Sequence, residues 1–324
     1  MINQCCLVCG SKEYSLEYIV SYGQIVKCKT CELVYTRFND PHIFYDENKG
    51  WENFDAIKAK LYNLPYERSK AYKRLRLLMK YCSSGRLIEF GSNTGEFLYV
   101  AANHCFHVTG VDHSSIFLSL NKTSNQEYFV TDINKFSSEK KFNAVVAFHF
   151  FEHLEDPKSF LEKARTMLFP DGILFLEVPN YGSLNRMKDG NNWDLFFKYH
   201  VSHFDIKSLI SLLKTSGFSI LCCRTLQPLD SYIMPYYLPL RHFAWKFLKR
   251  SFASNIKSVL QKNTKVELNI EDEKKIANSL KAKLFHIETT LINWLSFPFL
   301  LHSYIVSRNE KGDILQIVAK KVDE

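Results

Sequence analysis

Short apolar stretches alternate with amphipathic stretches through the middle of this 324-residue chain. The apolar stretches, which predict strands, cover residues 87–90, 107–111, 128–130, 143–148 and 173–178. The stretches in which apolar residues recur at helical spacing cover residues 66–81, 96–102, 157–168 and 206–216. Strands and helices that alternate in this way predict an α/β fold, with a mostly parallel sheet covered by helices on both faces.

The last strand of the predicted sheet lies far along the chain from the others. A strand at residues 218–222 follows the helix that ends near Gly217, and its expected partner comes only at residues 313–320. The chain between them is predicted to be a mainly helical, basic insertion. The predicted organisation is a cysteine-rich module at residues 1–40, a connector at 41–65, a core at 66–225, the insertion at 226–303 and the final strand of the core sheet at 304–324.

Most of the positive charge falls within this predicted insertion. The formal net charge is +8, and residues 241–283 hold eleven Lys and Arg against four Asp and Glu, a local charge of +7. Residues 241–260 place apolar side chains on one helical stripe and basic ones beside it. Such a helix suits either peripheral contact with an anionic membrane or a lid packed on the core, and both interpretations stay open. An anionic substrate would suit either.

Composition and hydropathy favour a cytoplasmic protein. Hydrophobic residues make up 46% of the chain and charged residues 23%, as in soluble globular proteins. The first ten residues lack the basic start and apolar run of a signal peptide, and no apolar run reaches the length that crosses a bilayer. The alternative location is the inner membrane face, reached through residues 241–260. Nucleic acid is not an expected partner, because the sequence has no aromatic and basic platform of a known RNA-binding module.

Four of the nine cysteines form two C-x-x-C pairs. Eighteen residues separate Cys6-x-x-Cys9 from Cys28-x-x-Cys31, a spacing typical of zinc sites. Cys5 lies beside the first pair, but only Cys6 gives the two-residue spacing. Four thiolates leave no open coordination position, so the predicted Zn²⁺ is structural.

A glycine turn and two acids follow successive predicted strands. Gly91 and Gly95 bracket the turn after the first strand, and Asp112 and Asp132 end the second and third. Ligands of wound α/β sheets bind outside the carboxyl ends of the strands, and glycine lets a backbone approach them closely. The turn is G-S-N-T-G, not G-x-G-x-x-G, and no phosphate-binding lysine follows it. The pattern favours a nucleoside ligand, with Asp112 on the ribose hydroxyls and Asp132 on the adenine amino group.

In combination, these segments resemble the motifs of class I S-adenosylmethionine-dependent methyltransferases. The segments that carry the resemblance are L-I-E-F-G-S-N-T-G-E-F, V-T-G-V-D-H-S, F-V-T-D-I, F-H-F-F-E-H-L and L-F-P-D-G-I-L-F-L-E-V-P-N. The resemblance covers residues 66–225 and implies a Rossmann-like core and an S-adenosylmethionine cofactor. The residues that it implies hold the cofactor are Glu89, Gly91, Asn93, Gly95, Asp112, Asp132 and Phe148. Two departures are Asn93, where a glycine is usual but where sugar C-methyltransferases also have asparagine, and Asn143, where an acid is frequent.

A histidine segment after the fifth predicted strand resembles the E-H-L-S-Y-F stretch of the sugar C-methyltransferases. His200 matches their histidine, His203 replaces their tyrosine and Tyr199 replaces their glutamate. Both histidines are candidate catalytic bases, because a histidine with a pKa near neutrality can take a proton from a methyl acceptor. The alternative is that they only brace the following helix.

A second group of histidines lies nearer the glycine turn in sequence. Glu152-His153 resembles the end of the E-x-x-E-H motif of quinone O-methyltransferases, which binds a divalent ion, but His149 stands in place of the first glutamate. Metal binding and a role in shaping the cofactor pocket both stay open.

The four-cysteine module before a methyltransferase-like core resembles nucleotide-sugar C-methyltransferases and related enzymes of surface-glycan clusters. The resemblance implies methyl transfer to a carbon or oxygen of a small acceptor, a nucleotide-linked or glycan sugar. The alternatives are a quinone- or lipid-type O-methyltransferase and a non-catalytic, zinc-bearing scaffold. The sequence leaves the acceptor, the methylated atom and the oligomeric state open.

Overall fold

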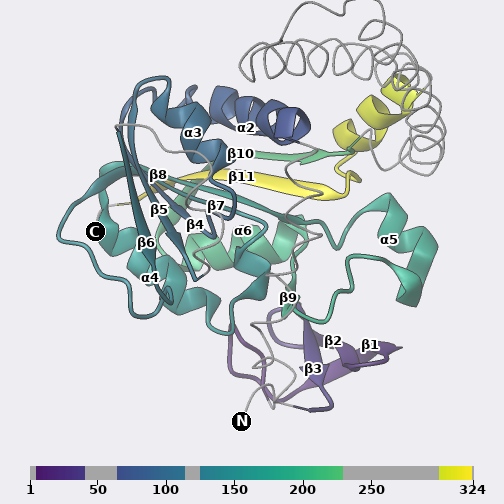
Figure 1. The fold of residues 1–324 in the computed structure, drawn as a ribbon. Coiled ribbons are helices and arrows are strands. Elements are labelled where there is room, and N and C mark those ends of the chain that lie inside the picture. The colour runs from purple at the N-terminus through teal and green to yellow at the C-terminus, as the bar shows by residue number, and fades with distance from the viewer. Residues whose placement is uncertain (1–4, 41–63, 114–124, 229–298, 323–324) are drawn as a thin grey trace, which may run out of the picture. The chain divides into compact units, whose positions relative to one another are not determined.

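A computed structural model describes residues 5–40, 64–113, 125–228 and 299–322 (Figure 1). The chain divides into two compact units, one made of residues 1–226 and 310–324 and the other of residues 227–309. The predicted connector at residues 41–65 and most of the predicted insertion, including its basic segment 241–283, lie outside the described residues. No helix of the described part is long and apolar enough to span a membrane.

A seven-stranded sheet forms the centre of the first unit, in the order β10-β11-β8-β7-β4-β5-β6 (Figure 1). Its strands are β4 (Gly85–Phe90), β5 (Phe106–Asp112), β6 (Gln126–Val130), β7 (Phe142–Phe148), β8 (Leu168–Pro179), β10 (Phe218–Leu226) and β11 (Ile314–Lys321). The strands β4, β5, β6, β7 and β8 run parallel to their neighbours among these five, and β11 is antiparallel to both β8 and β10. The predicted α/β class is confirmed, including the partner strand supplied from the C-terminal end of the chain.

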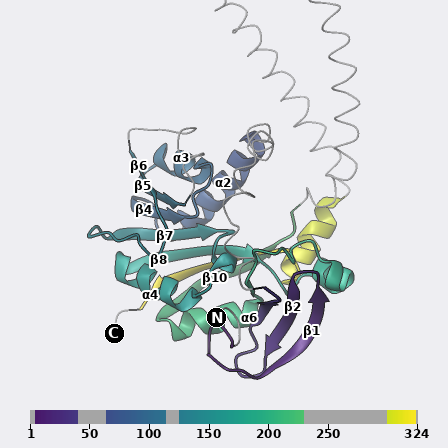
Figure 2. The ribbon, with the colours of Figure 1, turned by 60° about the horizontal axis from the view of Figure 1, so that its bottom comes forward.

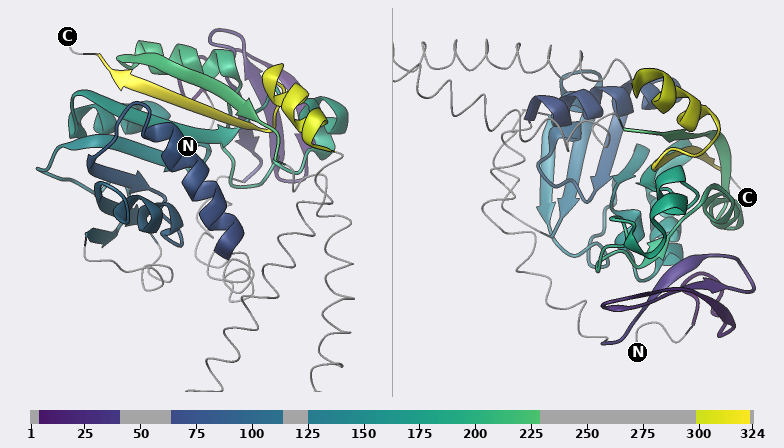
Figure 3. Two further views of the ribbon diagram at one scale, coloured as in Figure 1. Left: turned by 90° about the horizontal axis from the view of Figure 1, so that it is seen from above. Right: turned by 90° about the vertical axis from the view of Figure 1, so that its right-hand side faces the viewer.

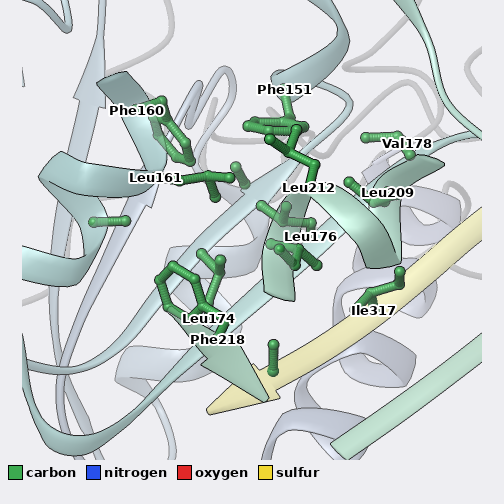
Figure 4. Packing of buried hydrophobic residues seen from close by; sticks show 14 of the residues in the cluster. Phe151, Phe160, Leu161, Leu174, Leu176, Val178, Leu209, Leu212, Phe218 and Ile317 are labelled. Atoms are coloured by element: carbon green, nitrogen blue, oxygen red, sulfur yellow. The ribbon is translucent and has the colours of Figure 1, made fainter. Parts of the chain in front are cut away.

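Helices cover both faces of this sheet (Figure 3). The described helices of the first unit are α2 (Leu64–Leu78), α3 (Glu96–Ala102), α4 (Pro157–Met167), α5 (Leu184–Asp189) and α6 (Ile206–Thr215), with single 3₁₀ turns η2 (Phe151–His153) and η3 (Gly190–Asn192). The helices α2 and α3 share one buried cluster with β4 and β5, whereas α4 and α6 share another with β7 and β8 (Figure 4). Neighbouring strand residues face opposite clusters, as Val145 and Val146 do.

Local capping fixes where α4 and α6 begin. Asp156 accepts the N–H of Ser159 over 2.9 Å, and Pro157 occupies the first helical position, as the sequence predicts. Asp205 and Ser208 form a reciprocal capping box at the start of α6, with Asp205 Oδ1 accepting the Ser208 N–H over 2.8 Å. These caps fix the points at which the segments after η2 and after β9 enter α4 and α6.

The cysteine module shares a sheet with the core. Strands β1 (Tyr14–Val20), β2 (Gly23–Cys28) and β3 (Val34–Phe38) form an antiparallel meander, of which Figure 2 labels β1 and β2. Strand β3 then pairs with the two-residue strand β9 (Ser202–His203), and Figure 1 labels both. The β-prone residues 18–20 and 34–36 lie within β1 and β3, whereas the sequence predicts neither β2 nor β9. Because β9 belongs to the predicted histidine segment, this pairing fixes that segment against the module.

In the second unit, the described residues include a helix over residues 299–308. Residues 304–309 thus belong to this unit, and of the predicted segment 304–324 the strand itself begins at Ile314.

Candidate active site

The turn after β4 lies at the carboxyl end of the parallel strands, where sheets of this kind bind ligands. Gly91 and Gly95 have φ angles of 70° and 72°, in the left-handed region. A Cβ at Gly91 would lie 2.5 Å from the Phe150 ring, and one at Gly95 would lie 2.8 Å from the Tyr128 hydroxyl oxygen. Both positions therefore require glycine, because a side chain would be strained and would also collide with its neighbours.

Asn93 connects the turn to the end of β5. Its φ is 45°, a conformation that asparagine adopts more readily than most residues. Its backbone N–H donates to Asp112 Oδ2 over 2.8 Å. Its own Oδ1 is buried without a hydrogen-bond partner in the part of the chain that the structure describes. The turn therefore places a carboxylate and a side-chain amide together at the sheet edge.

Glu89 is a buried carboxylate just before the turn. Its side chain is buried, and its Oε2 has no hydrogen-bond partner among the described residues. Burial raises the pKa of Glu89 well above its usual range, and the Arg74 guanidinium opposes this rise. Because an unpaired buried polar atom is costly, this carboxyl group suits a ligand that donates a hydrogen bond.

Asp132 and Phe148, the other two predicted cofactor residues, have different surroundings. Asp132 follows β6, and its Oδ1 accepts the N–H of Asn134 over 2.7 Å. Phe148 ends β7 and is buried edge-on against Phe97 and Phe175, with ring centroids 4.8 and 5.0 Å away. The structure thus groups Asp132 with the strand ends, whereas Phe148 packs into the core beside α3.

A polar network that the sequence does not reveal lies at the ends of β7 and β8. The Arg74 guanidinium from α2 contacts both carboxylate oxygens of Glu177, which also accepts a hydrogen bond from Gln316. The His149 ring lies between two carboxylates, with Nε2 3.2 Å from Glu177 Oε1 and Nδ1 3.4 Å from Glu152 Oε1. Desolvation opposes protonation, but the two carboxylates prevail and raise the pKa of His149 to about 9. This histidine is therefore a cation at neutral pH.

Glu152, His153 and His200 form a compact cluster beside this network. One ligand atom from each side chain lies within 4.8 Å of the other two. The His153 and His200 rings meet edge to face with centroids 4.7 Å apart, and each Nδ1 lies 2.9 Å from a backbone carbonyl oxygen, of Tyr199 and Leu195 respectively. Burial lowers the pKa of His200 to about 4. The fold thus unites a predicted base with the Glu152-His153 pair.

The four cysteines of the two C-x-x-C pairs also gather at one point. Their Sγ atoms all lie within 4.8 Å of one another, with Cys6 and Cys31 3.4 Å apart and Cys9 and Cys28 3.5 Å apart. All four are free thiols, and Cys5 is not part of the group. Thiolates around one Zn²⁺ at about 2.3 Å lie about 3.8 Å from one another, so the cluster has the size that this ion needs.

The two cysteine pairs have similar backbone turns. The Gly10 N–H donates to the Cys6 carbonyl over 2.9 Å, and the Glu32 N–H donates to the Cys28 carbonyl over 3.1 Å. Gly10 has a φ of 73° and Glu32 a φ of 62°. A glutamate thus occupies, after the second pair, the left-handed position that a glycine occupies after the first.

Comparison with protein families finds a match that spans the strands around this site. Residues 63–222 match a family model described as a methyltransferase domain. The chain contains a methyltransferase domain. C-methyltransferase NovU of Streptomyces niveus is 27% identical over 145 residues, which are 43% of this chain and 34% of that protein. The chain therefore matches about a third of the length of this relative.

Two of the solved structures to which the chain is similar are methyltransferases. N-methyltransferase NodS of Bradyrhizobium japonicum, solved with S-adenosyl-L-homocysteine, is 19% identical and has a TM-score of 0.44, covering 58% of this chain and 91% of that one. A SAM-dependent methyltransferase of Archaeoglobus fulgidus is 17% identical and has a TM-score of 0.48, covering 81% and 98%.

His203, the second predicted base, connects the methyltransferase domain to the cysteine module. It is buried, with its ring centroid 5.1 Å from that of Phe196. Its Nε2 lies 2.9 Å from Thr36 Oγ1, whose hydroxyl donates to the His200 carbonyl over 2.8 Å. The Thr36 hydroxyl proton is thereby committed, so Nε2–H of His203 must be the donor. Burial lowers the pKa of His203 to about 3.

Sequence reasoning about the methyltransferase domain misses the residues that surround its histidines. Arg74 and Glu177 are more than a hundred residues apart along the chain, and no local spacing relates them. Glu177, a charged residue within the apolar run 173–178, is a sequence signal of this network. A buried strand carries a carboxylate only when the carboxylate is paired.

Proposed function

We propose that this protein is an S-adenosylmethionine-dependent methyltransferase that acts on a small, anionic, sugar-type acceptor. The observation that carries the proposal is the group formed by the glycine turn, the buried Glu89 carboxyl and the Asn93–Asp112 contact at the carboxyl edge of a methyltransferase domain. When bound, S-adenosylmethionine supplies an electrophilic methyl group, and the protein's residues hold and orient the two reactants.

The proposed cofactor site follows the strand ends. Asp112 accepts the ribose hydroxyls, and Asp132 meets the adenine amino group one strand further along. Gly91 and Gly95 give the turn its left-handed backbone at the strand ends, and the space beside each is filled by Phe150 and Tyr128. Glu89 and Asn93 Oδ1 are buried oxygens that lack a hydrogen-bond partner in the described ranges, and they fit the hydrogen-bond donors of such a ligand. Phe148 acts indirectly, through its packing against α3.

The proposed acceptor side contains His200, which lies next to Glu152 and His153. Its Nδ1 is hydrogen-bonded to a carbonyl, which leaves the lone pair on Nε2 to take the proton that the acceptor loses on methylation. His203 donates to Thr36 and therefore serves to position the segment. The support for a sugar acceptor is the resemblance of residues 199–204 to sugar C-methyltransferases, together with the C-methyltransferase relative.

We also propose that Cys6, Cys9, Cys28 and Cys31 hold one structural Zn²⁺. The size of the cluster and the four free thiols support this ion, because tetrahedral thiolate sites are typical of zinc. The basic segment 241–260, proposed as a peripheral membrane contact or a lid, lies outside the described residues. A cytoplasmic location remains part of the proposal.

Isothermal titration with S-adenosylmethionine and S-adenosylhomocysteine tests the cofactor. We expect the wild type to bind both and Asp112→Asn to lose about tenfold or more in affinity, because hydrogen bonds to a charged group contribute about 1.5–3 kcal/mol. Asp171→Asn is the matched control, since Asp171 pairs with Lys320 and its exposed side chain lies near the start of β8. A folded wild-type protein that binds neither compound would favour the non-catalytic scaffold.

A further inference from the structure

Two hydrogen bonds to main-chain carbonyls fix the segment before β9 against the turn η2. The Val201 N–H donates to the Glu152 carbonyl over 2.9 Å, and the Tyr199 carbonyl accepts a hydrogen bond from His153 Nδ1 over 2.9 Å. The pairing of β9 with β3 holds the same segment from its other side. The positions of His153 and His200 relative to Glu152 are therefore set by main-chain geometry.

The hydrogen bonds of both rings determine their tautomers. A carbonyl oxygen accepts only, so Nδ1 carries the proton in His153 and in His200. The lone pair of each neutral ring is then on Nε2. Metal-binding histidines are usually oriented in this way, with the second nitrogen donating to a carbonyl or a carboxylate.

Glu152 has the features of a ligand that lacks its ion. It is 1% exposed, and neither carboxylate oxygen has a hydrogen-bond partner among the described residues. Its nearest ion-pair contact among the described residues is His149 Nδ1, 3.4 Å from Oε1, and the same ring also approaches Glu177 through Nε2. Because burying a carboxylate without hydrogen bonds is costly, a group that engages its oxygens would stabilise the fold.

We propose that Glu152, His153 and His200 bind a divalent transition-metal ion. Two imidazole nitrogens and one carboxylate form a ligand set that suits Zn²⁺, Mn²⁺ or Fe²⁺ better than Mg²⁺ or Ca²⁺. Three protein ligands leave coordination positions open, as in catalytic metal sites. Resting on the proposed function, this inference assigns an oxygen of the acceptor to an open position, where the ion would lower the pKa of that hydroxyl so that its proton is lost to solvent. His200 Nε2 would then hold the ion and would not take the proton itself.

Mn²⁺ binding tests the site separately from the cysteine cluster, because Mn²⁺ prefers nitrogen and oxygen ligands to thiolates. The experiment titrates the full chain, loaded with a single equivalent of Zn²⁺ for the four thiolates, with Mn²⁺ and follows the free ion by electron paramagnetic resonance. We expect the wild type to bind one Mn²⁺ per chain. Glu152→Gln, which keeps the side-chain shape, and His200→Ala should each weaken Mn²⁺ binding by about 100-fold or more.

The matched control is His104→Ala. His104 Nδ1 lies 2.7 Å from the Val100 carbonyl oxygen, a hydrogen bond of the same kind outside the cluster, so this variant should bind Mn²⁺ like the wild type. Circular dichroism and zinc content establish that each variant is folded. Wild-type protein that binds no Mn²⁺, or folded cluster variants that bind it normally, would overturn the inference. Titration with S-adenosylmethionine in the same samples tests the proposed function separately, since the cluster variants keep Asp112 and the glycine turn.

Discussion

The four-cysteine cluster and the Glu152–His153–His200 cluster both gather metal-ligand side chains within 4.8 Å, yet they are built in different ways. In the cysteine cluster, each C-x-x-C pair lies in a turn closed by a main-chain hydrogen bond between residues four apart. In the second cluster, the two segments lie 46 residues apart and meet through one main-chain hydrogen bond and one from the His153 ring to a carbonyl. Spacing along the chain therefore reveals the first site, whereas only the fold reveals the second.

The two clusters are also linked by a shared strand pair. Strand β3 follows the second cysteine pair and pairs with β9, which follows His200. Thr36 in β3 donates to the His200 carbonyl. Disturbing the cysteine module should therefore affect the histidine cluster. Variants in the module and at Thr36 test this link.

The largest expected effect is from Cys28→Ser. Loss of one thiolate should abolish zinc binding and lower the free energy of unfolding by at least about 2 kcal/mol, because a structural Zn²⁺ contributes about 10 kcal/mol or more. Zinc content and urea unfolding measure both quantities. Cys5→Ser is the control and should keep the ion, since Cys5 lies outside the group. Equal zinc loss in both variants would contradict the assignment of the ligands.

A smaller effect is expected from Thr36→Val, which removes the hydroxyl between the two clusters. The His200 carbonyl and the His203 Nε2–H would each lose a buried partner, at a cost of about 1–3 kcal/mol. Thr166→Val is the control, because the exposed Thr166 hydroxyl bonds only within its own helix, to the Lys163 carbonyl. Urea unfolding measures the difference. The link between the clusters would be refuted by equal stability of the two variants.

The smallest expected effect, and a stabilising one, is from Glu32→Gly. The left-handed φ of Glu32 costs about 1 kcal/mol that glycine does not incur, and the exposed Lys27–Glu32 ion pair offsets little of it. Glu13→Gly is the control, since Glu13 is not in the left-handed region and its replacement should slightly destabilise the protein. Thermal unfolding of zinc-loaded protein should place Glu32→Gly above the wild type. A lower midpoint would mean that the ion pair outweighs the strain.

The elements that the sequence predicts well are those whose signal lies within a few residues. Strand–turn–helix alternation locates β4 to β8, and Asp156-Pro157 locates the start of α4. Strand β9 cannot be predicted from the sequence, because two residues give no periodicity and the strand is defined by its pairing with β3. α5 escapes for a similar reason: it is short, buries none of its residues and begins where Ser183 accepts the Arg186 N–H.

The candidate site divides in the same way. The glycine turn and Asp112 follow from local pattern, and the structure joins them through the Asn93 N–H. The sequence names His200 and His203 together, but three residues along an extended segment are enough to direct one to Glu152 and the other to Thr36. Which of the two meets Glu152 depends on the register of β9 against β3, and that is a property of the tertiary structure.

The position of β11 in the sheet has a consequence for how the protein is made. β11 lies between β8 and β10, although both of these strands leave the ribosome before it does. Until residues 314–321 have been synthesised, the edges of β8 and β10 that pair with β11 lack this partner. The nascent chain therefore carries two uncovered strand edges during this period, which exposes it to aggregation until β11 is made.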